Sequence, residues 1–203
     1  MQSLVVACAD VGSVAKGNFG WWSSHGEKGN LPSSLAHHVA TMLNTGIPIA
    51  LGLECPLFVP LFENENSLTS ARPGERSRPW SAGAGCGALA TGIVQTTWLL
   101  QEIRRKTTSH TSAFLSWPAF ATSATGLFLW EAFVTGSAKR KTHIADAKAG
   151  AKAFMQALPD PTRVNAVICD SGVQSLIGAA LLRTGWTADP TILQESCLVV
   201  RAG

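Results

Sequence analysis

The chain has 203 residues, of which 46% are hydrophobic and 14% charged, and its formal net charge is +3. This composition excludes a disordered chain, so we expect residues 1–203 to form a single domain with a sizeable core. The small net charge does not by itself indicate nucleic acid binding. The five cysteines are scattered and form no Cys-x-x-Cys pair, which favours reduced thiols in a cytoplasmic protein over disulfides or a zinc ribbon.

The first half of the chain contains two short apolar runs that each end in a carboxylate. Continuous apolar runs of this length predict strands that are covered on both faces. Asp10 closes the first run and Glu54 closes the second. The predicted elements are a strand over 3–9, a hairpin strand over 17–24, a helix over 33–44 and a strand over 47–53. The first strand is short and begins without basic residues, so we do not interpret it as a signal peptide.

The second half begins with a polar segment rich in proline, glycine and arginine, at about 60–86. Long connections of this kind are usually functional or mobile. The elements predicted after it are a helix over about 87–106, a strand over 126–134, a helix over 143–157, a final helix over about 164–183 and a strand over 196–202. In the first of these helices we expect Leu89, Ile93, Trp98 and Leu99 to face inward. Strands that alternate with helices indicate an α/β sheet with helices on its faces.

Two segments without charged residues, 81–101 and 107–130, have the length of a membrane span. The first is glycine-rich at its start and runs directly into Glu102, while the second contains His110, Pro118 and many serine and threonine residues. We therefore interpret both as buried segments and expect no membrane partner.

Asp10 and Glu54 each terminate a strand that should lie in the middle of the sheet. If these strands are parallel neighbours, both carboxylates emerge at the same edge, where ligand crevices of open α/β sheets lie. Two adjacent carboxylates repel each other unless they are protonated or bridged by a cation. A hard divalent ion, Mg²⁺ or Mn²⁺, is the cation that such oxygen ligands prefer.

Asp170 and Glu131 are two further candidates. On the predicted final helix Asp170 shares a stripe with Val173 and Ile177, so its carboxylate should face the sheet. A carboxylate buried against apolar surface needs a partner. Glu131 lies within an apolar strand, so its carboxylate needs a partner for the same reason.

Each of the four acids also has a structural interpretation. Asp10 precedes Val-Gly and could make a turn, and Glu54 could cap the following turn or pair with an arginine. Asp170 could be a helix N-cap, and Glu131 could face solvent on an edge strand. The sequence alone leaves these alternatives open.

The order of these parts resembles the ribonuclease H-like superfamily, and within it families of uncharacterised proteins. The resemblance extends over most of the chain and rests on short motifs, namely "VVACAD" (5–10), "GLECPL" (52–57), "LWEAF" (129–133) and "AVICDSGVQSLIGAAL" (166–181). It implies a ribonuclease H-like mixed sheet with helices on both faces. Glu54 stands where such families more often have an aspartate.

The resemblance also implies a metal-dependent phosphoryl-transfer enzyme, a nuclease or a nucleotide phosphohydrolase, that uses a carboxylate cluster. Asp10 would bridge two Mg²⁺ or Mn²⁺ ions, Glu54 and Asp170 would each bind one, and Glu131 would complete the catalytic set. Nucleic acid or a nucleotide would be the partner. The alternative is a non-catalytic ribonuclease H-like binding module that has lost its metals and whose acids pair with arginines of the 72–78 segment.

The polar segment supplies the candidates for substrate binding. Arginines bind phosphates in a bidentate manner, and tryptophans stack on bases, although a tryptophan is more often part of a core or groove wall. The candidates are Arg72, Arg76, Arg78, Trp80, Trp21 and Trp22.

Gly85 lies in "GAGCGA" (83–88), at the start of a predicted helix. Its backbone amides could bind an anion, or its glycines could simply allow close packing. No strand precedes this motif, which argues against a dinucleotide site. His25 and His143 are lone histidines in contexts typical of loops.

Overall fold

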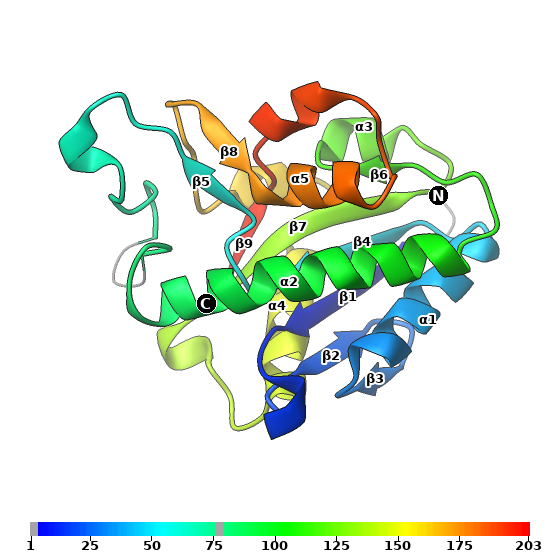
Figure 1. Ribbon diagram of the computed structural model, residues 1–203. Coiled ribbons are helices and arrows are strands. Elements are labelled where there is room, and N and C mark those ends of the chain that lie inside the picture. The colour runs from blue at the N-terminus through cyan, green and yellow to red at the C-terminus, as the bar shows by residue number, and fades with distance from the viewer. Residues whose placement is uncertain (1–3, 76–78) are drawn as a thin grey trace.

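The computed structural model, which describes residues 4–75 and 79–203, contains a seven-stranded mixed sheet (Figure 1). The strands lie in the order β3-β2-β1-β4-β7, and both β6 and β9 pair with β7 beyond it. Two further strands, β5 and β8, form a small separate sheet. The strands are β1 (Val5–Asp10), β2 (Gly20–Ser23), β3 (Lys28–Gly29), β4 (Ile49–Leu53), β5 (Phe58–Pro60), β6 (Ala113–Phe114), β7 (Leu127–Val134), β8 (Val173–Ser175) and β9 (Val199–Ala202).

Strand direction brings three carboxyl ends to one edge of the sheet. β1, β2 and β3 are successively antiparallel, whereas β4 is parallel to β1 and β7 is parallel to β4. The register pairs Ala9 with Leu53 and Leu53 with Glu131. Asp10 therefore ends β1 next to the point where Glu54 follows β4, which confirms that these two acids lie on neighbouring parallel strands.

Helices cover both faces of the sheet. The helices α1 (Pro32–Asn44), α2 (Gly83–Lys106) and α5 (Leu176–Arg183) share one core with the sheet, and α3 (Trp117–Ala121) and α4 (His143–Gln156) share the other. Short 3₁₀ turns connect them: η1 (Val14–Lys16), η2 (Glu65–Ser67), η3 (Gly136–Ala138), η4 (Pro161–Val164) and η5 (Pro190–Gln194). In α1 the apolar stripe of Leu35, Val39 and Met42 faces the sheet, at the spacing of an amphipathic helix.

The α/β class and most predicted elements are confirmed, but the predicted final helix is wrong over its first half. Residues 164–175 form a turn, a loop and the strand β8, which pairs antiparallel with β5, and the helix begins only at Leu176. Ser175 caps that helix by accepting a hydrogen bond from the amide of Gly178. Trp98, expected to face inward, is 44% exposed. Within the described ranges, no helix is long and apolar enough to cross a membrane.

Candidate active site

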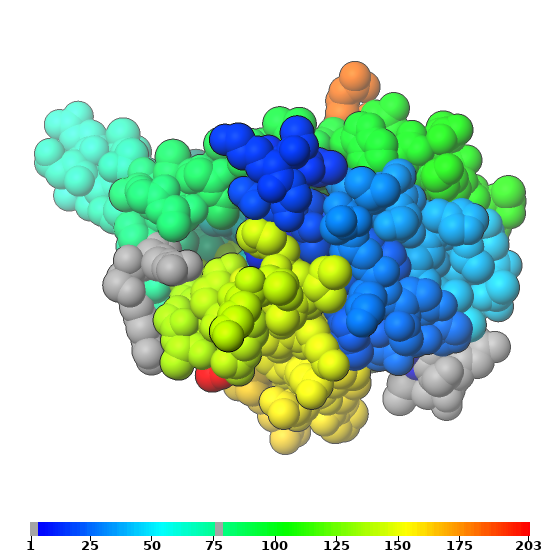
Figure 2. Space-filling model, turned by 90° about the horizontal axis from the view of Figure 1, so that it is seen from below, coloured from blue at the N-terminus to red at the C-terminus, as the bar shows by residue number. Residues whose placement is uncertain are grey.

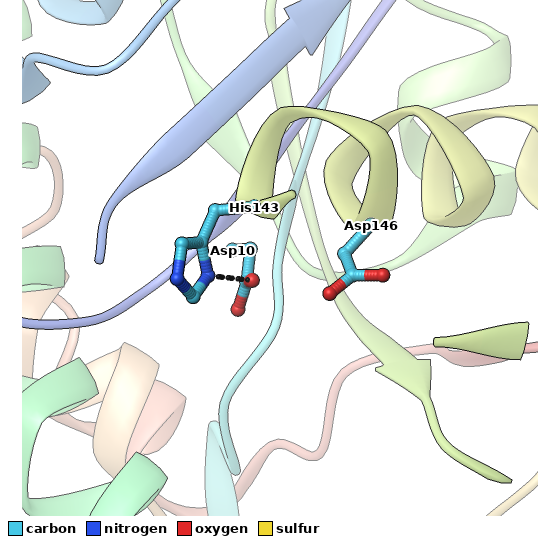
Figure 3. Close-up of side chains that lie close together, drawn as sticks. All are labelled: Asp10, His143 and Asp146. Carbon is cyan, nitrogen blue, oxygen red and sulfur yellow. Dashed lines mark hydrogen bonds and ion pairs between the residues drawn. The ribbon is translucent and has the colours of Figure 1, made fainter. Parts of the chain in front are cut away.

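Asp10, at the end of β1, and Glu54, directly after the neighbouring strand β4, lie beside the first turn of α4 at the carboxyl edge of the sheet. Figure 3 shows Asp10 with His143 and Asp146 of that turn. Asp10 and Asp146 are buried, and the side chain of Glu54 is only 11% exposed. His143 comes from the first turn of α4, and its Nδ1 lies 2.6 Å from Oδ2 of Asp10. The cluster therefore joins β1, β4 and α4, which are far apart in the sequence.

The sequence around α4 explains why its first turn reaches Asp10. Thr142 caps the helix by accepting a hydrogen bond from the amide of Ala145. Gly20 of β2, the register partner of Asp10, lies against the backbone of His143 and Ile144, and a Cβ atom there would approach Ile144 N to 2.4 Å. Glycine is thus required for this close approach.

Lys139 places its ammonium among the three carboxylates. Its Nζ lies 2.6 Å from Oε1 of Glu54, 3.1 Å from Oδ2 of Asp146 and 3.7 Å from Oδ2 of Asp10. Asp146 also accepts a hydrogen bond from the amide of Arg140, which fixes the backbone that carries Lys139. The cluster consists of three acids, one ammonium and one histidine.

Burial and repulsion set the protonation of this cluster. Burial and the neighbouring Asp10 carboxylate raise the pKa of Glu54 to about 8, although Lys139 opposes both. Burial lowers the pKa of Lys139, but the attraction of Glu54, Asp10 and Asp146 outweighs it, so that this pKa is raised overall. Lys139 is therefore held as an ammonium ion.

The donor set fits a metal ion. One ligand atom each of Asp10, His143 and Asp146 lies within 4.8 Å of the others, so these three residues could hold a cation. Oε2 of Glu54 is buried and makes no hydrogen bond to any described residue. A buried oxygen without a partner is costly, and a cation bound beside it would satisfy it. Carboxylate oxygens are the ligands that Mg²⁺ and Mn²⁺ prefer, whereas an imidazole nitrogen suits Zn²⁺.

Comparisons with protein families, with curated proteins and with solved structures found no match to this chain. The function must therefore be argued from the geometry and chemistry of the site.

Glu131 lies in a different, buried network. Both of its oxygens accept hydrogen bonds from the guanidinium of Arg72, at 2.6 and 2.8 Å, and Oε2 also accepts the amide of Leu57 at 3.0 Å. Arg72 further donates through Nε to Glu75 at 2.9 Å and packs over the ring of Phe58. Glu131, expected in the catalytic set, and Arg72, expected to bind substrate, are both almost fully buried and hold one another.

The structure separates the remaining candidates from the carboxylate cluster. Asp170 is exposed in the loop before β8, so the expectation that it faces the sheet from a helix is wrong, and it does not belong to the Asp10 group. Trp80 is half-buried and donates through Nε1 to the carbonyl of Ser70. Arg76 and Arg78 lie outside the described residues.

Gly85 lines a pocket beside the cluster. This pocket lies between the first turns of α2 and the ends of β4 and β7, and Glu54, Pro56, Val134 and Thr135 also line it. A Cβ atom at Gly85 would approach the carbonyl oxygen of Pro79 to 2.1 Å, which supports the close-packing interpretation of this glycine. Anion binding by Gly85 stays a prediction.

Sequence reasoning missed Lys139, His143 and Asp146. The signal that could have found two of them is the i, i+3 spacing of His143 and Asp146, which places both on one face of the predicted helix 143–157. Small residues at Ala147 and Gly150 continue that face, as expected of a helix that packs closely on a sheet. Lys139 lies in an irregular segment, where no periodic pattern indicates its direction.

Proposed function

We propose that the chain is a metal-dependent phosphoryl-transfer enzyme of ribonuclease H-like type, acting on nucleic acid or on a nucleotide. The observation that carries this proposal is the convergence of Asp10, Glu54, Asp146 and His143 at the carboxyl edge of the sheet. The strand order also supports it, since β1 begins an antiparallel β1-β2-β3 unit and is followed in the sheet by β4 and β7, both parallel to it. This is the order of parts on which the resemblance rests.

In this proposal Asp10, Glu54 and Asp146 supply oxygen ligands and His143 supplies a nitrogen ligand or a proton carrier. A bound divalent cation would neutralise the charge on a phosphoryl group and lower the pKa of a bound water. His143, with a side chain 40% exposed, lies at the solvent-facing side of the cluster, where it can exchange protons. In this proposal Asp146 takes the role of metal ligand that the resemblance implies for Asp170.

The test combines metal binding and hydrolysis. Calorimetric titration with Mn²⁺ and Mg²⁺ should show binding by the wild type, and Asp10→Asn and Asp146→Asn should weaken it at least about tenfold. With metal, hydrolysis of bis(4-nitrophenyl) phosphate, 4-nitrophenyl phosphate, single-stranded RNA and single-stranded DNA separates diesterase, monoesterase and nuclease activity. Asp160→Asn, an exposed carboxylate, is the matched control.

A metal-free binding module is the second candidate, and Lys139 favours it. The ammonium of Lys139 already lies among the carboxylates, so it can permanently take the place that a metal ion would otherwise occupy. Absence of binding at millimolar Mn²⁺, with the native fold retained, would reject the enzyme and leave the module.

A further inference from the structure

We propose that Lys139 is the resident cation of the carboxylate cluster and that a divalent metal binds there only by displacing it. Metal occupancy would then be coupled to the position of Lys139 and of the segment 135–142 that carries it. The inference rests on the proposed function, because it concerns how the same site takes its metal.

The contacts of Lys139 are those of a cation shared by three acids. One oxygen each of Glu54, Asp146 and Asp10 lies within 3.7 Å of its Nζ, and the three acids come from three different elements of the fold. A Mg²⁺ ion coordinated by the same oxygens would lie about 2.0–2.1 Å from each. It would occupy the volume of the ammonium, so the two cations exclude one another.

Charge and tethering together determine how strongly a divalent ion competes with the ammonium of Lys139. When all three acids are ionised, as metal coordination requires, one ammonium leaves an excess of negative charge, which a divalent ion reduces further than an ammonium does. The ammonium, however, is tethered, so it competes at a high effective concentration and weakens every cation that binds from solution. We therefore infer that Lys139 sets the affinity of the site and discriminates against monovalent ions.

The segment that carries Lys139 allows it to leave. Ala138 is buried and anchors the segment, but the side chain of Lys139 is 31% exposed, and Arg140 and Lys141 beside it are exposed. Figure 2 shows the segment before α4, in yellow-green, at the surface of the molecule. Rotation about the four-carbon stem of Lys139 is enough to carry the ammonium into water.

The first experiment is amine acetylation of the wild type, with and without saturating Mn²⁺, resolved by mass spectrometry. An ammonium held by three carboxylates reacts slowly, so Lys139 should be protected without metal and should react at least about fivefold faster with it. Lys141 and Lys152, both exposed, should not change and serve as internal references.

The second experiment is Mn²⁺ titration of Lys139→Met, Lys139→Gln and the control Lys141→Met. Removal of the tethered competitor should tighten binding about tenfold or more in both Lys139 variants, while Lys141→Met binds like the wild type. Adding Asp10→Asn to Lys139→Met should abolish the gain, which locates the bound ion at the cluster.

The outcomes separate this inference from the proposed function. If the wild type binds Mn²⁺ but its Lys139 stays protected and Lys139→Met binds no tighter, the displacement is wrong and the metal site stands. If Lys139→Met binds Mn²⁺ and the wild type does not, Lys139 is the resident cation and the enzyme proposal fails. If neither protein binds, both are wrong. The acetylation result uses the wild type, so it holds even if a variant fails to fold.

Discussion

Arg72 and Glu131 form an ion pair almost completely removed from solvent. Arg72 binds Glu131 through two hydrogen bonds and Glu75 through two more, one from its side chain and one from its backbone amide. Desolvation of these charges is offset only while all of them are paired. The network joins the polar segment before α2 to β7. It stabilises the fold only while all of its charged members are present.

Arg72→Met should therefore destabilise the protein strongly. Loss of the guanidinium leaves two buried carboxylates, Glu131 and Glu75, with backbone amides but without a charged partner, and such a change costs about 3–5 kcal/mol. Urea unfolding followed by circular dichroism measures it. The matched control is Arg163→Met, because Arg163 forms an exposed pair with Asp160, its side chain is 83% exposed, and its loss should cost less than about 1 kcal/mol. A loss below about 1 kcal/mol for Arg72→Met would show that the buried pair is not needed.

The position of an acid can be predicted from the sequence only where local structure determines the direction of its side chain. Asp10 and Glu54 end strands, and a strand end in a parallel arrangement determines where the side chain emerges, so their meeting was predictable. Glu131 was placed correctly within a strand. Its partner Arg72, however, comes from an irregular segment 59 residues away, and no local rule pairs them.

At the scale of elements, α4 positions the site because it packs unusually close to the sheet. A Cβ atom on Gly150 would lie 3.0 Å from Sγ of Cys8 and 3.2 Å from Cβ of Ala132. Since Asp146 lies one turn before Gly150 on the same helix, the distance between helix and sheet sets the distance between Asp146 and Asp10.

Gly150→Val should displace α4 and weaken metal binding. The extra methyl groups overpack the contact with Cys8 and cost about 1–3 kcal/mol of stability, and a shift of the first turn by about 1 Å should reduce Mn²⁺ affinity at least tenfold. Calorimetry and urea unfolding measure the two effects. Lys152→Val places the same β-branched residue at an exposed position of α4 and should leave the affinity unchanged. Equal affinities of both variants would show that this contact does not position the site.

The error over 164–183 has a physical explanation at this scale. Val173, Ile177 and Leu181 have helical spacing, yet Val173 belongs to β8, where it pairs with Pro60 of β5. A strand pair between distant segments satisfies backbone groups that a longer helix would satisfy locally, and periodicity cannot distinguish the two. Asp170 was consequently expected on a helix facing the sheet, whereas the acid that a helix brings to the cluster is Asp146 of α4.

His38 joins α1 to β2 through a buried contact, and its burial favours the neutral form of the ring. Its Nε2 is hydrogen-bonded to Oγ of Ser23 at 2.9 Å, and its ring stacks on Trp21 with 5.4 Å between centroids. Burial lowers the pKa of His38 below its ordinary value, Glu27 opposes this, and His25 and His37 add to it.

Stability should consequently fall when the pH drops below about 6.5, the ordinary pKa of histidine. The unfolded state takes up a proton there that the folded state resists, so His38 contributes stability above this pH and loses it below, with a slope of at most about 1.4 kcal/mol per pH unit. Urea unfolding at about pH 7.5 and 5.5 should show a smaller loss for His38→Gln than for the wild type. Replacement of the exposed His110 by glutamine should not reduce the loss. Identical losses in wild type and His38→Gln would contradict the argument.

At the scale of the whole molecule, strand alternation predicted the α/β class, but not the pairing of β6 and β9 with β7. β9, from the end of the chain, lies beside β7 along Glu131–Val134, and β6 pairs with the start of the same strand. The pairing of β9 with β7 joins segments more than sixty residues apart, and the sequence carries no local signal for it. The site depends on this assembly, because its candidate ligands come from β1, the end of β4 and α4, which only the complete sheet brings together.

Metal should therefore stabilise the whole fold and not one element. A cation that binds only the folded state adds about 2.7 kcal/mol at a concentration 100 times its dissociation constant. For a chain of this length, that corresponds to a rise in Tm of about 5–11 °C. Differential scanning calorimetry with Mn²⁺, and again after chelation with EDTA, measures the shift. Asp10→Asn should lose it because the ion then lacks a ligand from β1, whereas Asp160→Asn, which changes an acid outside the cluster, should retain it. An equal shift in Asp10→Asn and the wild type would mean that the ion binds away from the carboxyl edge of the sheet. The site proposed there would then have no part in the stabilisation.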